Sequence, residues 1–321
     1  MFKDVTPKFE EARDALNRAE RVVIISHVRP DADAIGANCA LKMVLKNFGK
    51  EVVSACADPV QENCFFINGA KNFVHDFPVN EFDLLVSVDC GGKKRTGFDE
   101  KPGFLDGKVP LLNIDHHDTN DDFGKINIVV PTACATCFIL LKFFEHCRYK
   151  ITPDIATALL AGIYFDTGSL THSNTTPFVY SAVASLLRKG AKLDLVTQNL
   201  FKAISVQQMR LLGRILERTR VNEDGVVTSA AMENDYKESG ANSHDASRAV
   251  DFLNTIAGSK FCILLSDDEK GEVKGSVRTQ RDDLDISKVA SALGGGGHKK
   301  AAGFGVRGKI KEERVFKIIE E

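Results

Sequence analysis

The sequence lacks several features that would define a function at once. Its 42 lysines and arginines nearly balance its 44 aspartates and glutamates, so no global basic field attracts nucleic acid, although a local cationic groove is compatible with this balance. No apolar run is long enough to span a bilayer, and residues 1–7 lack the apolar core of a signal peptide. We therefore expect a cytoplasmic protein with no membrane segment.

The cysteines form no repeated metal-binding pattern. Only Cys134 and Cys137 have CxxC spacing, and they open an apolar helical stretch without a second such pair nearby. A redox or zinc pair would fit this spacing. Most cysteines in a reducing compartment are small core residues, however, so packing is the favoured interpretation.

Three short apolar runs, at residues 21–26, 83–88 and 109–114, are followed at once by acidic residues or histidines. Continuous apolar runs separated by helical patterns predict strands of a parallel sheet that is buried on both faces. Ligands of such sheets gather at the carboxyl ends of the strands. The side chains delivered to this edge are His27, Asp31, Asp33, Asp89, Asp115, His116 and His117. A fourth apolar segment looks helical and ends in Asp166.

The rest of the chain predicts two α/β domains. The first has an additional strand, expected at 51–55. It also has five helices, expected near 8–19, 33–48, 134–147, 153–164 and 177–189. The second has a hairpin around Asp224-Gly225, a helix at 243–257 capped by Ser243, and strands at 260–265 and 272–278. The polar helical stretch between them is typical of a connector. The predicted boundaries are 1–190 for the parallel-sheet domain, 191–218 for a helical linker and 219–321 for the smaller domain.

Carboxylates with a minority of imidazoles suit a hard or intermediate divalent ion, with Mn²⁺ or Mg²⁺ ahead of zinc. The chain offers more ligands than one ion needs, and two ions about 3.5–4 Å apart are the arrangement used to hydrolyse phosphate esters and anhydrides. Taken alone, each group has a simpler explanation, and Asp33 is equally well explained as a helix cap. Their joint occurrence at three strand ends favours a two-metal site.

A glycine run, Gly294–Gly297, is followed by His298, Lys299 and Lys300. Such a run can be a flexible connector, or it can let backbone N–H groups approach a phosphate, and the basic residues favour an anion site. It lacks the Lys-Ser/Thr ending of a nucleoside-triphosphate-binding loop. Arg278, on an expected strand, suits bidentate phosphate contact and a surface salt bridge equally well.

Taken together, these segments resemble the DHH–DHHA1 phosphoesterase superfamily. The matching stretches occur in the family's order over nearly the whole chain, and they are residues 26–36, 88–90, 115–117, 162–168 and 294–303. By size and spacing the chain looks most like the branch of bifunctional oligoribonucleases and PAP phosphatases, the nanoRNases. Three residues depart from the family pattern. Ala32 replaces a common glycine, and Leu170 and Thr171 replace an aromatic and a basic residue that we associate with substrate contact.

The resemblance implies roles for the matching residues. One ion would be held by His27, Asp31 and Asp89. A second would be held by Asp33, Asp89, His116 and Asp166, so that Asp89 bridges the two. His117 would face the scissile phosphate as electrostatic stabiliser or proton donor, and Asp115 would orient an adjacent histidine. The implied substrate-binding residues are Arg278, Gly295, Gly296, Gly297 and His298, with the substrate in a cleft between the domains.

The expected function is a Mn²⁺-dependent hydrolase, with Mg²⁺ as the alternative ion. Its substrates would be short RNA or DNA oligonucleotides, linear dinucleotides such as pApA, and 3′-phosphoadenosine 5′-phosphate (pAp). An inorganic pyrophosphatase is the main alternative, although a lysine-rich anion clamp would be expected where this chain has His298. A non-catalytic nucleotide-binding regulator is less favoured, because no metal ligand is missing. Relatives often form dimers through the first domain, which makes a homodimer one expectation here.

Overall fold

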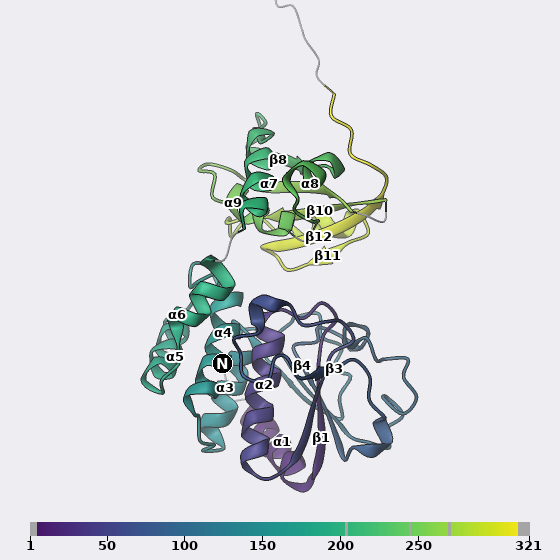
Figure 1. Cartoon of the computed structure of the whole chain (residues 1–321), viewed down its shortest axis with the longest axis vertical. Helices are drawn as coiled ribbons and strands as arrows, with labels where there is room; N and C mark the ends of the chain where they lie inside the picture. The colour runs from purple at the N-terminus through teal and green to yellow at the C-terminus, as the bar shows by residue number, and fades with distance from the viewer. Residues whose placement is uncertain (1–4, 203–204, 244, 269–270, 314–321) are drawn as a thin grey trace, which may run out of the picture. The chain divides into compact units, whose positions relative to one another are not determined.

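The structure of the chain is a computed structural model, and it describes residues 5–202, 205–243, 245–268 and 271–313 (Figure 1). The chain divides into two compact units, Met1–Ala203 and Ile204–Glu321. Each unit has its own six-stranded sheet and its own hydrophobic core. Among the described residues, none of the helices has the length and apolar character that crossing a membrane requires.

The sheet of the first unit is parallel throughout, as predicted. Its strands are β1 (Arg21–Ser26), β2 (Glu51–Ala55), β3 (Phe73–Val74), β4 (Leu84–Val88), β5 (Leu111–Asp115) and β6 (Ile126–Val129), in the order β3-β2-β1-β4-β5-β6. Every residue of β4 and β5 is buried, which is why apolar residues predominate in both strands. The strands predicted at 21–26, 51–55, 83–88 and 109–114 are confirmed.

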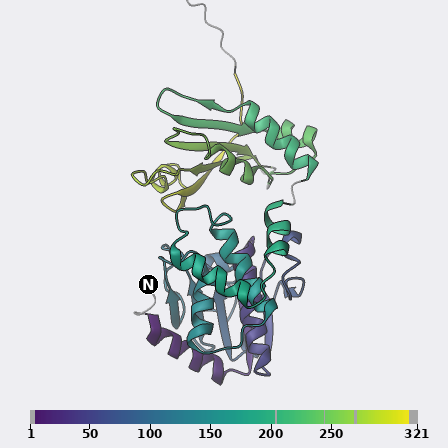
Figure 2. The ribbon, with the colours of Figure 1, turned by 90° about the vertical axis from the view of Figure 1, so that its left-hand side faces the viewer.

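The helices of this unit pack on the sheet and against one another (Figures 1 and 2). They are α1 (Thr6–Arg18), α2 (Ala32–Asn47), α3 (Thr136–His146), α4 (Pro153–Asp166), α5 (Pro177–Arg188), α6 (Leu193–Thr197) and a π-helical turn, Gln198–Lys202. Short 3₁₀ helices are η2 (Glu62–Cys64), η3 (Val79–Glu81) and η4 (Lys93–Thr96). Helices α2 and α4 pack closely because Gly36 faces the Ala158 carbonyl, which a Cβ atom at residue 36 would overlap.

The CxxC pair belongs to the core of the first unit. The Cys134 and Cys137 side chains are 2% and 0% exposed, and both thiols are free. Burial raises the pKa of each thiol, which keeps both protonated and unreactive. The structure therefore supports packing as the role of this pair.

The second unit has a mixed sheet. Its strands are β7 (Arg220–Val221), β8 (Val226–Ala231), β9 (Phe261–Asp267), β10 (Glu272–Arg278), β11 (Gly296–Gly297) and β12 (Ala301–Arg307), in the order β11-β12-β10-β9-β8-β7. All neighbours are antiparallel except β8 and β9. Its helices are α7 (Val206–Glu217), α8 (Glu233–Ser239), η6 (Asp245–Arg248), α9 (Ala249–Leu253) and α10 (Ser287–Ala292). The hairpin expected around Asp224-Gly225 is present as β7 and β8.

Two features of the structure differ from the sequence prediction. The segment expected as a separate linker is divided between the units: α6 lies in the first, while α7 places Leu211 and Ile215 in the core of the second. The helix expected at 243–257 is replaced by the short η6 and α9. Ser243 does not cap it, because the Asn242 and Asp245 side chains each accept the other's backbone N–H and so start η6 at Asp245.

Candidate active site

Strand register brings the first site residues together. Ser26 of β1 is paired with Val88 of β4, and Val88 is paired with Ile114 of β5, so the three strands end level with one another. The residues at these ends, His27, Asp89 and Asp115, are 3%, 2% and 0% exposed. Polar groups so deeply buried require partners, and here they are neighbours at one edge of the sheet.

Three groups of side chains in the described part of the chain could each hold a metal ion, because the ligand atoms within each group lie within 4.8 Å of one another. These groups are His27, Asp31 and Asp89; then Asp33, His116 and Asp166; and finally Asp89, His116 and His117. The first group is the same as the first expected ligand set. The second group contains three of the four residues of the other expected set and lacks Asp89.

Asp89 contacts both ligand sets, one with each carboxylate oxygen. Its Oδ2 atom lies 3.5 Å from His27 Nε2, and its Oδ1 atom lies 3.5 Å from His116 Nε2. The backbone of Asp89 has a φ of +61°, a conformation that is unfavourable for residues other than glycine and is concentrated at functional sites. This arrangement is what a carboxylate that bridges two ions requires.

The capping role considered for Asp33 belongs to Asp31. The Asp31 Oδ1 atom accepts hydrogen bonds from the backbone N–H groups of Asp33 and Ala34, at 2.9 and 3.1 Å, and so caps α2. Its other oxygen, Oδ2, lies 3.7 Å from His27 Nε2. Asp31 therefore begins the helix and faces the first ligand set, which leaves Asp33 free to serve the second.

The N-terminus of α3 supports two of the carboxylates, a contribution that the sequence analysis missed. The backbone N–H groups of Thr136 and Cys137 donate to the two oxygens of Asp33, at 2.6 and 2.9 Å. The Thr136 hydroxyl donates to Asp89 Oδ1 at 2.9 Å. Helix N-termini favour negative charge, so α3 offers these buried carboxylates hydrogen-bond donors and holds them in a fixed orientation. A threonine at an expected helix start was the only available signal.

Asp166, the last residue of α4, completes the second set. Its Oδ2 atom lies 3.2 Å from His116 Nε2. Burial raises the pKa of Asp166 to about 6, although the hydrogen bond with His116 opposes this shift. Burial also raises the pKa of Asp33, and the negative charges of Asp89 and Asp166 raise it further.

The pKa of His27 also reflects the negative charge of the neighbouring carboxylates. Burial lowers its pKa, but hydrogen bonds to Asp31 and Asp89 outweigh burial and raise the pKa to about 10. The buried carboxylates thus attract positive charge strongly. Divalent cations with oxygen and imidazole ligands meet this requirement, so the residues present fit a divalent metal centre.

Asp115 and His117 form an oriented pair beside the two ligand sets. His117 Nδ1 lies 2.8 Å from Asp115 Oδ1. The side-chain amide of Asn120 donates to the other oxygen of Asp115, at 2.6 Å, and to the Cys90 carbonyl, at 2.9 Å. Burial raises the pKa of Asp115, but the bonds to His117 and Asn120 outweigh burial and lower it. Asn120, which the sequence analysis also missed, therefore holds the ionised carboxylate that orients His117.

The residues expected to bind substrate lie in the second unit. Arg278 ends β10 and Gly297 ends β11; they flank β12, where they pair with the adjacent residues Ala301 and Ala302. The Arg278 guanidinium Nε lies 3.5 Å from Asp251 Oδ1, so the surface pair considered from the sequence is present.

Glycines are required at two positions of this segment. A Cβ atom at residue 295 would overlap the Gly303 carbonyl, and residue 297 has a φ of +143°. Gly296, in contrast, has nothing within 4 Å of the place a Cβ would occupy, so one side of its backbone is open to a ligand. The His298 N–H donates to the Ala301 carbonyl and closes the turn between β11 and β12.

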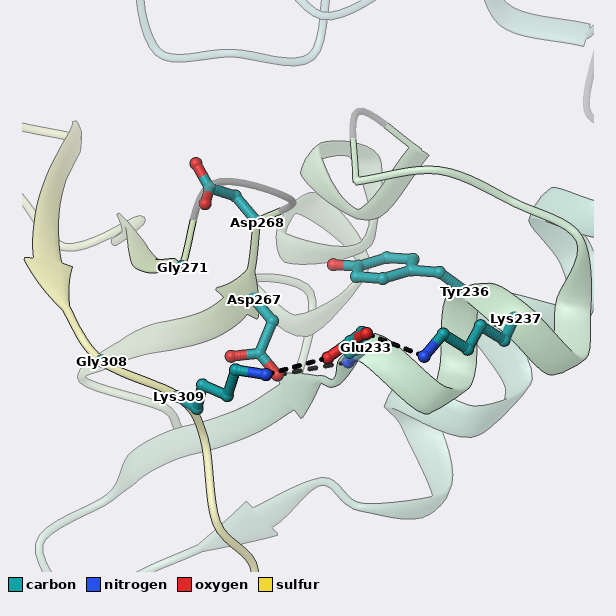
Figure 3. Close-up of a pocket in the computed structure, with 8 residues that line it drawn as sticks. All are labelled: Glu233, Tyr236, Lys237, Asp267, Asp268, Gly271, Gly308 and Lys309. Atoms are coloured by element: carbon teal, nitrogen blue, oxygen red, sulfur yellow. Dashed lines mark hydrogen bonds and ion pairs between the residues drawn. The ribbon is translucent and has the colours of Figure 1, made fainter.

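A cavity of about 310 Å³ in the second unit includes none of the expected site residues (Figure 3). It is lined by Glu233, Tyr236, Lys237, Asp267, Asp268, Gly271, Gly308 and Lys309. Glu233 pairs with both Lys237 and Lys309, at 2.8 and 3.3 Å. The lining has three carboxylates and two lysines, both of which pair with Glu233, so it offers no excess positive charge to a nucleotide.

Comparison with known proteins agrees with the geometry. Residues 21–163 match the DHH family, N-terminal domain, and residues 223–321 match the DHHA1 domain. The chain is 33% identical over 303 residues to the bifunctional oligoribonuclease and PAP phosphatase NrnA of Thermus thermophilus, and the match covers 93% of this chain and 88% of that protein. The chain belongs to the DHH family. The resemblance inferred from the sequence motifs is thereby confirmed.

Two further matches extend over nearly the whole chain. The protein of the same name from Bacillus subtilis is 22% identical, and the match covers 94% of each chain. The crystal structure of an exopolyphosphatase-related protein from Bacteroides fragilis aligns with a TM-score of 0.87 at 23% identity, covering 95% of this chain and 92% of the other. The structural match confirms the two-part α/β fold.

Proposed function

We propose that this protein is a Mn²⁺-dependent phosphoesterase that hydrolyses short oligonucleotides and linear dinucleotides such as pApA to mononucleotides, and pAp to AMP. The contact of Asp89 with both ligand sets is the observation that carries the proposal, because a bridged pair of ions is the arrangement suited to phosphoester hydrolysis. The oligoribonuclease and PAP phosphatase relatives support the choice of nucleotide substrates.

The two ligand sets would each hold one metal ion. His27, Asp31 and Asp89 would hold one ion, and a second would be held by Asp33, Asp89, His116 and Asp166. When bound, two divalent ions acidify a water and neutralise charge on the phosphoryl oxygens. Thr136 and the N-terminus of α3 keep Asp33 and Asp89 in place for this task.

The Asp115–His117 pair supplies the remaining chemistry of the first unit. Asp115 fixes the His117 ring through Nδ1, so that the ring can stabilise the scissile phosphate electrostatically or donate a proton to the leaving oxygen. In the second unit, Arg278 and the open backbone at Gly296 would contact the other phosphate or the base of the substrate.

A substrate panel tests this proposal. Metal-stripped protein is supplied with Mn²⁺ or Mg²⁺ and assayed on oligonucleotides of two to about eight residues, a range that reaches beyond the smallest single-strand sites. The panel also includes pAp and pyrophosphate. We expect release of mononucleotide from the shortest substrates, release of AMP from pAp, faster turnover in Mn²⁺ and none without metal. Faster hydrolysis of pyrophosphate would indicate a pyrophosphatase, and binding of nucleotides without any turnover would indicate a regulator.

The role of Arg278 can be separated from its surface pair. We expect Arg278→Ala to raise KM about tenfold with little change in kcat, because a group that binds ground state and transition state equally affects KM alone. Asp251→Ala is the matched control, since it removes the same ion pair and leaves the guanidinium in place. Steady-state kinetics on pAp measure both variants. Equal effects of the two substitutions would show that Arg278 acts only through the pair.

A further inference from the structure

A basic segment lies directly after the bridging carboxylate. Residues Lys93, Lys94 and Arg95 form most of η4, all three side chains are exposed, and only Cys90, Gly91 and Gly92 separate them from Asp89. The roles assigned above to the two ligand sets, to the Asp115–His117 pair and to the second unit do not use this segment.

The segment is held in place by its own backbone. Thr96 is fully buried, and its hydroxyl donates to the Lys93 carbonyl at 2.6 Å and accepts the Phe98 N–H at 3.1 Å. The Arg95 carbonyl accepts the Val28 N–H at 2.8 Å, which ties η4 to the loop that carries His27. Arg95 therefore starts from a fixed backbone position, which lowers the entropy lost when its side chain binds a ligand.

The Arg95 side chain reaches the edge of the metal centre. Its Nη2 atom lies 3.1 Å from His27 Nδ1. The opposite ring nitrogen of His27, Nε2, faces Asp31 and Asp89 at 3.7 and 3.5 Å. The guanidinium thus lies beside the imidazole on the side away from the carboxylates.

The His27 ring cannot serve both the Val28 carbonyl and Arg95, so the Arg95 guanidinium needs another hydrogen-bond acceptor. His27 Nδ1 lies 2.8 Å from the Val28 carbonyl, and it can either donate to that carbonyl or accept from Arg95, but not both. If His27 held a metal ion through Nε2, its proton would lie on Nδ1, so it would donate to Val28 and offer Arg95 nothing. Among the described residues, no carboxylate lies within ion-pair distance of the Arg95 guanidinium.

We infer that Arg95 binds a second phosphate of the substrate, the one next to the scissile phosphate. This inference rests on the proposed function and names its substrate class: nucleotides that carry a terminal phosphate beside the bond to be cleaved. The scissile phosphate belongs on the carboxylate side of His27, whereas Arg95 lies on the other side. A guanidinium suits this task because its planar fork matches two oxygens of a phosphate.

Two dinucleotides that differ by one phosphate test the inference. Turnover of pApA and ApA in Mn²⁺ is compared for the wild type, Arg95→Ala and Arg95→Lys, with Lys94→Ala as the matched control on the same exposed turn. We expect Arg95→Ala to lower kcat/KM for pApA by about tenfold to a hundredfold, mainly through KM, because hydrogen bonds to charged groups have that magnitude. Turnover of ApA should stay within about twofold, and Arg95→Lys should recover part of the loss because it keeps a point charge.

Other outcomes separate the alternatives. If Arg95→Ala slows both dinucleotides equally and weakens Mn²⁺ binding in a calorimetric titration, Arg95 merely positions His27 and the inference is wrong. An unchanged preference for pApA also overturns it. If the wild type cleaves neither dinucleotide, the proposed function fails instead. The binding affinities of pApA and ApA, measured by equilibrium titration, then test the role of Arg95. Tighter binding of pApA than of ApA in the wild type, lost in Arg95→Ala, supports the inference. An equal preference for pApA in the wild type and in Arg95→Ala refutes it.

Discussion

Replacing Asp89 with asparagine should lower turnover of pApA at least about a thousandfold, because even the partners that orient metal ligands are worth ten- to a hundredfold. Asp89 is the one described carboxylate that contacts both ligand sets, through Oδ2 to His27 and Oδ1 to His116. An amide has nearly the same shape but cannot neutralise two cations. Both ions should therefore bind more weakly, and kcat should fall more than KM rises.

The fold of the Asp89→Asn variant should survive. Asp89 follows β4 rather than lying within it, and the Thr136 hydroxyl can still donate to the amide oxygen at that position. Asp83 gives a matched control at the other end of the same strand, where its carboxylate accepts the Glu20 and Arg21 N–H groups. Asp83→Asn should retain turnover. Circular dichroism verifies folding, and an active Asp89→Asn variant would refute the bridging role.

Asp235→Asn should lower the free energy of unfolding of the second unit by about 3 kcal/mol. This value is at the lower end of the range found when one partner of a buried ion pair is removed. Asp235 is 1% exposed and its two oxygens accept hydrogen bonds from both terminal nitrogens of Arg218, at 2.9 and 2.6 Å. The Met232 N–H donates to it as well, at 2.8 Å. The variant leaves Arg218 without its main counter-charge. Denaturant unfolding monitored by circular dichroism measures the loss.

The effect of Asp235 should depend on pH with a defined sign. Burial raises its pKa, but Arg218 and the Met232 N–H outweigh burial and hold the pKa below its ordinary value of 3.8. A lowered folded-state pKa stabilises the protein fully above the ordinary value, and that stability is lost as the pH falls through the folded-state value. Wild type and Asp235→Asn should therefore converge in stability at acid pH. Glu233→Gln, on the same helix but exposed, should change stability little at any pH. A stability difference that persists at low pH would contradict this account.

The sequence was informative wherever a periodic pattern coincided with buried structure. The runs at 21–26, 83–88 and 109–114 are β1, β4 and β5, and level strand ends made the convergence of His27, Asp89 and Asp115 predictable. Asp166 was harder, because it ends a helix and reaches the site only through the packing of α4 on α2 and α3. The motif resemblance supplied what periodicity alone could not.

The supporting residues could not be found in the same way. The Thr136 side chain donates to Asp89 and the Asn120 side chain donates to Asp115. Nothing in their local sequence distinguishes these two residues from ordinary capping or turn residues. Arg95 stands in an exposed basic turn, and only its distance to His27 distinguishes it from its neighbours. The expected linker also failed as a separate segment, because the amphipathic α7 buries Leu211 and Ile215 in the second unit. Tertiary packing decided each of these cases.

Calorimetric titration of Mn²⁺ into the metal-stripped protein, with turnover of pApA followed in parallel, tests the central claim most directly. The two ligand sets joined by Asp89 predict two ions per chain in the wild type, with turnover appearing only as the second ion binds. Binding of a single ion with full turnover, or turnover that persists in excess chelator, would contradict the account.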